Sequence, residues 1–314
     1  MLQFFADWLA YSVLGLEPAS QIGAAVNFFV YDSIKVTLLL AIVVFLVGLV
    51  RSFVTPSKVK AWLGGRREGV GNVLAALLGV PTPFCSCSAV PLFIGFIEAG
   101  VPLGVTFSFL VASPLVNEVA LALLLGMFGW QIALIYLVSG LAVAIVAGII
   151  IGRLNLEGEV EDFAVKRANK GRAVALTWRE RMVYALGESK RITRKVLPYL
   201  LLGIGLGAFI HGYAPSDFLA SLAGKDNALA VPIAVLLGIP LYSNAAGMIP
   251  IVGVLVAKGV ALGTALAFMM SVIGLSLPEF VILRKVLKPK LLAVFAATLF
   301  VSFTLLGYLF NAIL

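Results

Sequence analysis

Long apolar runs recur along this chain, and they constrain its fold more than any other feature of the sequence. Each run is close to the ~20 residues that an α-helix needs to cross the hydrocarbon core of a bilayer. The runs are 33–52, 102–126, 131–152, 195–213, 261–283 and 291–313. With 61% hydrophobic and 12% charged residues, there is too little polar surface to coat a soluble globule of 314 residues. The sequence therefore predicts an all-α polytopic membrane protein and excludes a soluble enzyme, a disulfide scaffold and a disordered chain.

Two further apolar regions, 70–98 and 229–257, are interrupted in the middle. Gly79–Pro83 breaks the first region and Gly238–Pro240 breaks the second. Proline removes a backbone donor and clashes with the preceding helical turn, so we expect two half-helices joined by irregular backbone in each region. A second proline predicts another break farther along each region; these prolines are Pro91 and Pro250.

The chain repeats itself with an offset of 159 residues. Glycines and prolines coincide at this offset, which shared apolar composition does not explain. The coinciding pairs include Pro56 with Pro215, Gly65 with Gly224, Gly79 with Gly238, Pro81 with Pro240, Pro91 with Pro250, and Gly100 with Gly259. Beyond residue 109 an offset larger by two residues brings Glu118 onto Glu279. We interpret the pattern as an internal duplication, which is a recurring design of secondary transporters.

The basic residues predict how the two halves are oriented. All but three of the 23 Lys and Arg residues lie in 51–67, 153–195 and 284–290, which read as cytoplasmic loops under the positive-inside rule. If 70–98 enters the membrane and returns, all three loops fall on one side and 214–227 falls outside. Each half then has about three full spans plus a re-entrant hairpin, and the two repeats have inverted topology.

The predicted organisation has four parts: an N-terminal interfacial segment 1–32, a first transmembrane repeat 33–152, a basic cytoplasmic linker 153–193 and a second transmembrane repeat 194–314. In the linker, Thr177 and Glu180 have the spacing of a capping box at a helix start. The amphipathic helix that follows suits the anionic cytoplasmic leaflet, as a solvated connector or as a regulatory element. A basic face with groove-reading elements is absent, so no nucleic-acid partner is expected.

The densest polar cluster in apolar sequence contains both cysteines of the chain, Cys85 and Cys87, with Ser86 and Ser88 beside them. A disulfide between thiols two residues apart would be strained, so both are expected to be free. In extended backbone, which the neighbouring prolines favour, the two thiols point to one side. They could then bind a soft or thiol-reactive solute. The alternative is that small residues here simply allow helices to approach closely.

The matching stretch of the second repeat supplies different side chains, of which Tyr242, Ser243 and Asn244 are polar. Asn244 takes the place of Cys85 at the repeat offset. We expect the two hairpins to meet as unlike walls of one solute site, with broken helices exposing backbone groups at mid-membrane.

Asn117 and Glu118 lie inside the predicted span 102–126. Burying a charge in a span costs at least ~2.5 kcal/mol, so Glu118 is a candidate proton carrier or a protonated structural residue. Asn117, a polar residue beside it, is a candidate solute ligand. Glu279 is the weaker proton-coupling candidate, because basic residues nearby could hold it in a surface ion pair. His211, the only histidine, reads as structural, and with two cysteines it completes neither a zinc site nor a hydrolase triad.

The runs Thr82-Pro83-Phe84-Cys85-Ser86-Cys87-Ser88 and Ser113-Pro114-Leu115-Val116-Asn117-Glu118, with Pro91 between them, resemble the signature of the YraQ/ArsP-type permeases. The resemblance covers roughly 30–312. It implies a multi-pass permease of a bacterial or archaeal inner membrane. Some members of that family export trivalent organoarsenicals, for which cysteines are natural ligands, and small thiols such as glutathione are candidate solutes for others.

These observations together predict a secondary permease, not an enzyme, for a small thiol-reactive or thiol-containing solute, with the lipid bilayer as its surroundings. No phosphate-binding loop, cofactor site or metal site is expected. A channel is the alternative within transport. A membrane thiol oxidoreductase using Cys85 and Cys87 is the alternative of another class, although such enzymes usually use a Cys-x-x-Cys pair and a second redox pair.

Overall fold

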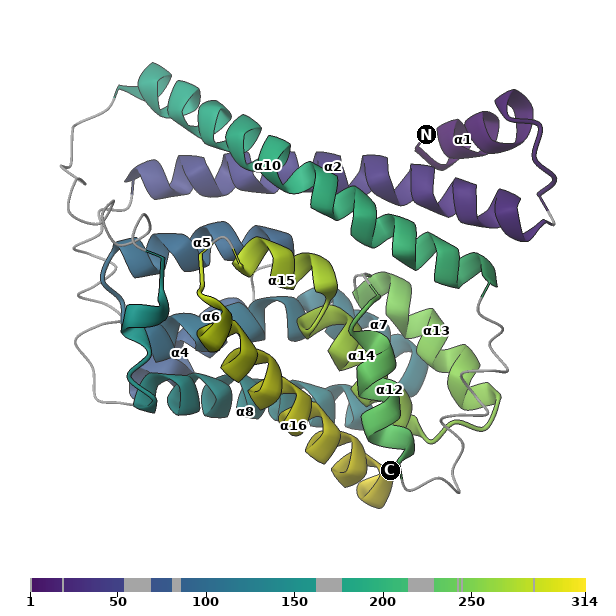
Figure 1. Ribbon diagram of the computed structural model, residues 1–314. Helices are drawn as coiled ribbons and strands as arrows, with labels where there is room; N and C mark the ends of the chain where they lie inside the picture. The colour runs from purple at the N-terminus through teal and green to yellow at the C-terminus, as the bar shows by residue number, and fades with distance from the viewer. Residues whose placement is uncertain are drawn as a thin grey trace.

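The computed structural model describes residues 2–18, 20–53, 69–80, 86–161, 177–213, 229–241, 243, 245–284 and 286–314. Regular structure in these residues is helical, apart from one isolated antiparallel bridge between Val160 and Leu287 (Figure 1). The chain begins with α1 (Leu2–Asp7) and a π-helical turn, η1 (Trp8–Val13). The prediction of an all-α polytopic membrane protein is confirmed at this level.

Twelve helices make up the body of the described structure, six from each half of the chain. Those of the first half are α2 (Gln21–Phe53), α4 (Val70–Gly79), α5 (Ser86–Glu98), α6 (Leu103–Leu115), α7 (Glu118–Phe128) and α8 (Trp130–Arg153). Those of the second half are α10 (Trp178–Tyr213), α12 (Ala230–Gly238), α13 (Ala245–Ala257), α14 (Leu262–Gly274), α15 (Leu277–Leu283) and α16 (Pro289–Ile313).

The helix starts recur at the repeat offset. The helices α5, α6, α7 and α8 begin at residues 86, 103, 118 and 130, and α13, α14, α15 and α16 each begin 159 residues later. This offset continues past residue 109, so Glu118 corresponds in position to Leu277 and not to Glu279. The larger offset predicted for this stretch is therefore wrong, because Glu279 lies two residues deeper in α15 than Glu118 does in α7.

Several helices match the predicted spans. Among the described residues, Trp130–Arg153, Leu262–Leu283 and Pro289–Ile313 are long and apolar enough to cross a membrane. The predicted spans 33–52 and 195–213 lie within α2 and α10. These helices have 33 and 36 residues, and at 1.5 Å per residue they extend about 50 Å, beyond a ~30 Å hydrocarbon core.

The predicted span 102–126 is bent in the structure. The structure divides it into α6 and α7, whose axes bend by 43° at a short break. The predicted half-helices 70–98 and 229–257 are present as α4 with α5 and α12 with α13. The further breaks expected at Pro91 and Pro250 are absent, because both prolines lie inside helices that continue for another seven residues. Each proline removes only one backbone hydrogen bond near the start of its helix, and the remaining hydrogen bonds keep the helix continuous.

The corresponding helices α5 and α13 end in the same way. Gly100 and Gly259 adopt positive φ angles of 75° and 93°, a conformation that glycine reaches without a Cβ clash. The next residue then donates its amide to a carbonyl five residues back, from Val101 to Phe96 at 3.0 Å and from Val260 to Leu255 at 3.1 Å. These are Schellman-type ends, and they turn the chain sharply into α6 and α14.

The long helices α2 and α10 run antiparallel along one edge of the molecule (Figure 1). Ser189 Oγ donates to the Ala41 carbonyl at 2.7 Å, and Gly205 lies against Phe29. Residue numbers therefore increase in opposite directions along the two helices. Large apolar side chains are exposed at four-residue spacing on α2, at Leu38, Ile42 and Leu46. A stripe of this kind suits contact with lipid.

The remaining helices pack beneath this pair. Figure 1 shows α5 and α15 just below α2 and α10, with α8 and α16 on the far side. The helix contacts agree, since α2 packs on α5, α10 packs on α15, and α5 packs on α15. Figure 1 also places α4 and α5 toward one end of the molecule and α12 and α13 toward the other. Of the elements that carry predicted site residues, α5 and α15 thus lie between the outer pair and the other helices.

Candidate functional site

The break between α6 and α7 is held by side chains at its edges. Asn117 precedes α7, and its Oδ1 accepts the Ala120 amide at 2.8 Å while its Nδ2 donates to the Pro114 carbonyl at 3.2 Å. Tyr136 on α8 is fully buried, and its hydroxyl donates to the Leu115 carbonyl at 3.0 Å. Backbone groups freed at the break are therefore satisfied by Asn117 and Tyr136.

The break between α14 and α15 occupies the corresponding place in the second half. The last turn of α14 is closed by the Leu275 amide, which donates to the Ser271 carbonyl at 2.8 Å. The Leu277 amide donates to the Ile239 carbonyl at 3.0 Å, so this break contacts the irregular segment between α12 and α13. Ser276 and Glu279 at the start of α15 are 0% and 1% exposed. Two polar side chains are thus buried at one helix break.

The halves pack crosswise around these breaks. The second helix of each hairpin contacts the short helix of the opposite half, α5 against α15 and α13 against α7. On the first of these contacts, aromatic rings form a chain. Phe93 meets Phe107 at 5.1 Å between centroids, Phe107 meets Phe295 at 5.2 Å, and Phe295 meets Phe280 at 6.1 Å. The chain links α5 to α15 through α6 and α16.

In the sequence, the predicted thiol and polar residues lie between or next to the two helices of each hairpin. Cys85, Tyr242 and Asn244 are outside the described residues. The first three residues of α5 are Ser86, Cys87 and Ser88, so Cys87 is helical and the extended backbone predicted for it is wrong. Proline disfavours helical backbone in the residue before it, and Pro81 and Pro83 both precede residue 86, so they do not prevent a helix from starting there. Ser243 is half-buried between α12 and α13.

The two acidic candidates differ in exposure, and in the opposite sense to that predicted. Glu118, expected inside a span, is exposed at the first position of α7. Glu279, expected in a surface ion pair, is buried. Hydropathy along the chain does not report which face of a helix a residue occupies, so the sequence could not rank the two. Ser276 and Tyr136 were not singled out from the sequence; the Ser-Leu-Pro-Glu spacing before α15 was the available signal for Ser276.

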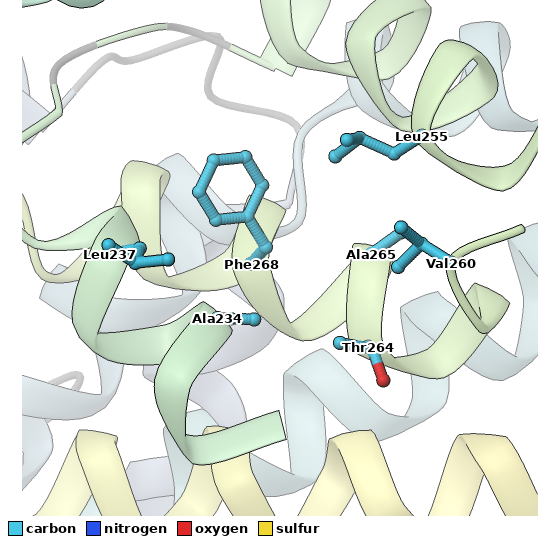
Figure 2. A pocket seen from close by; sticks show the side chains of 7 residues that line it. All are labelled: Ala234, Leu237, Leu255, Val260, Thr264, Ala265 and Phe268. Atoms are coloured by element: carbon cyan, nitrogen blue, oxygen red, sulfur yellow. The ribbon is translucent and has the colours of Figure 1, made fainter. Parts of the chain in front are cut away.

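A small apolar cavity lies between α12, α13 and α14 (Figure 2). It is lined by Ala234, Leu237, Leu255, Val260, Thr264, Ala265 and Phe268. Its volume of about 10 Å³ is near the minimum for one water molecule, and its lining offers almost no polar partner. This cavity therefore does not fit a solute, and within the described residues it is distinct from the helix breaks.

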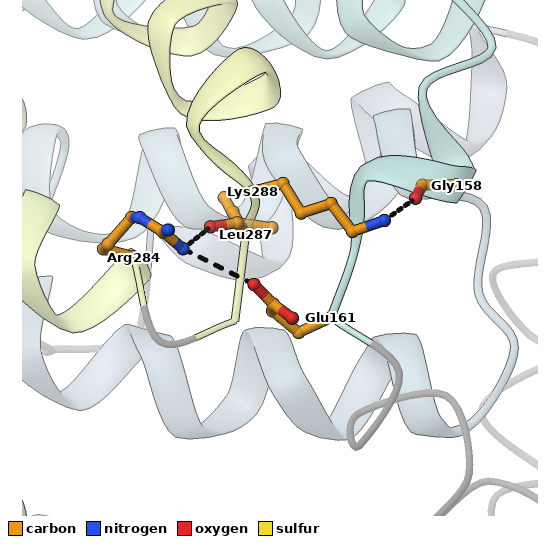
Figure 3. Close-up of polar contacts among 5 residues, drawn as sticks. All are labelled: Gly158, Glu161, Arg284, Leu287 and Lys288. Atoms are coloured by element: carbon orange, nitrogen blue, oxygen red, sulfur yellow. Dashed lines mark hydrogen bonds and ion pairs between the residues drawn. The ribbon is translucent and has the colours of Figure 1, made fainter.

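Polar contacts join the segment after α8 to the segment before α16 (Figure 3). We call this contact the clasp; it joins 158–161, after α8, to 284–288, before α16. The Glu161 amide donates to the Val286 carbonyl and the Lys288 amide to the Glu159 carbonyl, both at 2.8 Å. Arg284 lies 3.4 Å from the Glu161 carboxylate, and Lys288 Nζ donates to the Gly158 carbonyl at 2.8 Å. The end of α8 and the start of α16 therefore lie on the same side of the molecule.

The start of α10 carries the predicted capping interaction in part. The Glu180 carboxylate accepts the Thr177 amide at 2.8 Å, as expected, but the Thr177 hydroxyl donates to the same carboxylate instead of accepting a backbone amide. These two hydrogen bonds, the backbone one first, lower the pKa of Glu180 below its ordinary value. The helix continues unbroken from here into the predicted span 195–213.

Among the described residues, His, Cys, Asp and Glu side chains form no cluster of three or more that could hold a metal ion.

Comparison with known proteins identifies a family and three relatives that match 60% or more of this chain. The family described as ArsP_1, predicted permease, matches residues 21–312. A UPF0718 protein of Methanocaldococcus jannaschii is 21% identical over 90% of this chain and 94% of its own. The UPF0718 protein YraQ of Escherichia coli is 26% identical over 77% of this chain and 68% of its own. A Streptococcus mutans protein, described as a subunit of a two-component membrane permease complex, is 26% identical over 60% and 63%. No solved structure matches the chain.

Proposed function

Since this chain belongs to the ArsP_1 family of predicted permeases, we propose that it is a secondary permease whose solute passes between the two halves, along their interrupted helices. The observation that carries this proposal is that both halves are interrupted at corresponding places, and that their interrupted elements pack crosswise, α5 on α15 and α13 on α7. Irregular backbone at membrane depth is tolerated where it is buried or lines a pathway. Broken helices at a repeat interface are the usual solute sites of such carriers.

We further propose that the halves are inverted-topology repeats, with the basic segments 51–67, 153–195 and 284–290 in the cytoplasm of a bacterium or archaeon. The corresponding helices α2 and α10 run antiparallel, which inversion requires. The clasp supports the same arrangement, because it joins the end of α8 to the start of its counterpart α16. Single-cysteine labelling in a Cys-less background tests this. Labelling of positions 57 and 216 from the same side of the membrane would rule out inverted repeats.

For the solute we propose a small thiol-reactive or thiol-containing molecule, such as a trivalent organoarsenical or a glutathione-like thiol. Thiols are soft ligands and exchange partners, and Cys85 and Cys87 are the only ones in the chain. Ser86, Ser88, Tyr242, Ser243 and Asn244 supply hydroxyl and amide groups from the two hairpins. Asn117, whose amide bonds on both sides of the α6–α7 break, positions that break beside the solute path.

Transport into proteoliposomes tests the thiol site. Cys85→Ser and Cys87→Ser should each lower uptake of methylarsenite or of glutathione at least about 10-fold, since serine keeps the size but loses soft coordination. Cys85→Ala and Cys87→Ala separate this from packing: close helix contact predicts that serine and alanine variants all transport at the parent rate, which would contradict the thiol site. Uptake that is unsaturable in the parent protein would instead favour a channel. A proton-gradient dependence lost in Glu118→Gln would assign coupling to Glu118.

A further inference from the structure

The first half of α10 presents an exposed row of basic and apolar side chains. We call this row the basic stripe; its members are Arg179, Val183, Leu186, Lys190 and Arg194. All five side chains are exposed, Val183 and Leu186 to 64% and 57%. They follow one another at spacings of three or four residues, so they lie within an arc of about 80° on the helix surface. The function proposed above uses none of them.

The basic stripe lies on a different side of α10 from the contact with α2. Ala185 and Ser189, one turn apart, are buried, and Ser189 Oγ donates to the Ala41 carbonyl of α2 at 2.7 Å. The two acidic residues in this half of the helix, Glu180 and Glu188, occupy positions outside the arc of the stripe. The stripe is therefore a face of basic and apolar residues without a carboxylate.

The contact with α2 also sets the level of the stripe relative to an apolar surface. Because Ser189 bonds the Ala41 carbonyl, the next residue, Lys190, lies at about the level of Leu38 and Ile42 on α2. Both of these apolar side chains are exposed, and both belong to the run 33–52 that is predicted to cross the membrane. Cations and lipid-facing apolar side chains thus occur at the same level on neighbouring helices.

An anionic phospholipid carries both kinds of group that this surface can bind. Its phosphate is a charge partner for lysine and arginine, whose long side chains can lie along apolar surface while their charged ends reach the headgroups. Its acyl chains suit the apolar residues of the stripe and of α2. A soluble polyanion would not account for the exposed Val183 and Leu186, and an uncharged lipid would leave the cations without a counter-charge.

We propose that the basic stripe of α10 binds anionic phospholipid, with lipid phosphates at the three cations and acyl chains against Val183 and Leu186. In the topology proposed above, this surface belongs to the cytoplasmic leaflet, to which the positive-inside rule assigns basic segments. Bound lipid would hold α10 in its contacts with α2 and α15. The binding surface does not depend on the chain being a permease, so the result of a transport assay leaves it unaffected.

Thermal unfolding of the full chain in mixed micelles tests the proposal. Phosphatidylglycerol should raise the unfolding midpoint in a saturable manner, whereas the same amount of phosphatidylcholine should not. The rise should shrink as sodium chloride increases from about 50 to about 500 mM, because salt screens exposed charges. Lys190→Gln and Arg194→Gln should each raise the phosphatidylglycerol concentration at half-maximal shift about 5-fold. The triple variant, which adds Arg179→Gln, should lose the shift.

Arg181→Gln is the matched control, because it removes one charge from the same helix outside the arc of the stripe and should leave the lipid response unchanged. Lys190→Arg keeps the charge and should retain the response of the parent protein. Since the substituted side chains are exposed, the midpoint in phosphatidylcholine should be the same in the stripe variants and the parent, which separates lost binding from failed folding.

Replacing the apolar members distinguishes lipid from a soluble anion. Val183→Ser combined with Leu186→Ser should weaken the response to phosphatidylglycerol, because acyl chains lose their contacts. An equal shift with inorganic phosphate would show a site for soluble anions and would overturn the proposal. So would a shift of equal size in the parent and the triple variant, or a parent protein that responds alike to phosphatidylglycerol and phosphatidylcholine.

Discussion

The three-helix units α4–α6–α8 and α12–α14–α16 pack in the same way with different chemistry. In each unit a glycine on the middle helix lies against the backbone of the long helix. A Cβ on Gly104 would lie 2.9 Å from the Gly152 Cα, and a Cβ on Gly263 would lie 2.6 Å from the Gly307 carbonyl oxygen. These two glycines are separated by the repeat offset. Close backbone approach between small residues is therefore the common element of both units.

The polar contacts of the two units lie in different places. In the first unit, Asn72 donates to Ser108 Oγ at 3.0 Å, and the corresponding residues Val231 and Ala267 are apolar. In the second unit, Asn311 donates to Thr264 Oγ1 at 3.0 Å and accepts the Thr264 amide at 3.1 Å. The spacing of these helices therefore depends on the glycines, and different hydrogen bonds can form within the same spacing.

The largest expected effect comes from adding a methyl group at either glycine. Gly104→Ala and Gly263→Ala should each lower the free energy of unfolding by about 3 kcal/mol or more, because the new Cβ meets backbone that cannot turn away. Thermal unfolding of the purified protein and the yield of monodisperse protein measure this loss.

Gly126→Ala on α7 is the control, since no atom lies within 4 Å of the position that its new methyl group would take, and stability should hold. If one of the two core variants were as stable as this control, the two units would not share the same close packing.

Exchanging the polar pairs should have an intermediate effect. Asn311→Ala should cost about 1–2 kcal/mol, because it leaves the buried Thr264 hydroxyl unsatisfied, whereas Thr264→Val should cost less, because the Asn311 side chain that it leaves is exposed. The double variant should cost less than the sum, with a coupling energy of about 1 kcal/mol. Asn72→Val with Ser108→Ala, which gives the first unit the residues of the second, should show the same pattern. Additive losses in both cycles would mean that the pairs contribute nothing beyond packing.

The cavity provides a smaller test of the comparison. At the place of Leu255 in the second half, the first half has Phe96, whose ring meets Phe109 edge-on at 5.0 Å. Phe96→Leu should open a matching cavity and cost about 1 kcal/mol, whereas Leu255→Phe should add stability of about 0.5 kcal/mol. Thermal midpoints of the two variants check this. A loss for Leu255→Phe would show that the second unit cannot accept the ring.

The smallest expected effect concerns the helix starts. The pKa of Glu180 is lowered in the folded state, so its contribution is present above the ordinary value of 4.5 and is lost as the pH falls through the lowered value. Ser20 before α2 accepts the Gly23 amide at 3.0 Å without a carboxylate. Amide-exchange protection at the start of α10 should therefore fall on acidification while that of α2 holds. Equal behaviour at both starts, or no change in Glu180→Gln, would contradict this.

Much of the helical architecture could be predicted because it depends on local signals. Prolines after Gly79 and Gly238 predicted both hairpin interruptions, and coinciding glycines predicted the repeat. The break before Asn117 could not be predicted, because it depends on Tyr136, which lies on another helix and bonds the Leu115 carbonyl. Pro114, one turn earlier, remains helical. For the candidate site, sequence identified the hairpin centres, but the burial of Glu279 depends on the packing of α15 against α5 and α10.

The clasp holds the two halves of the chain together by noncovalent contacts. It fastens the end of the first half to the second half before the rest of the linker begins, and α2 with α10 and α8 with α16 add further contact between the halves. The peptide link through 162–176 is therefore not what holds the halves together. Two separately synthesised half-chains could assemble into the same molecule, and the architecture is equally available to a single fused gene and to a pair of unfused ones.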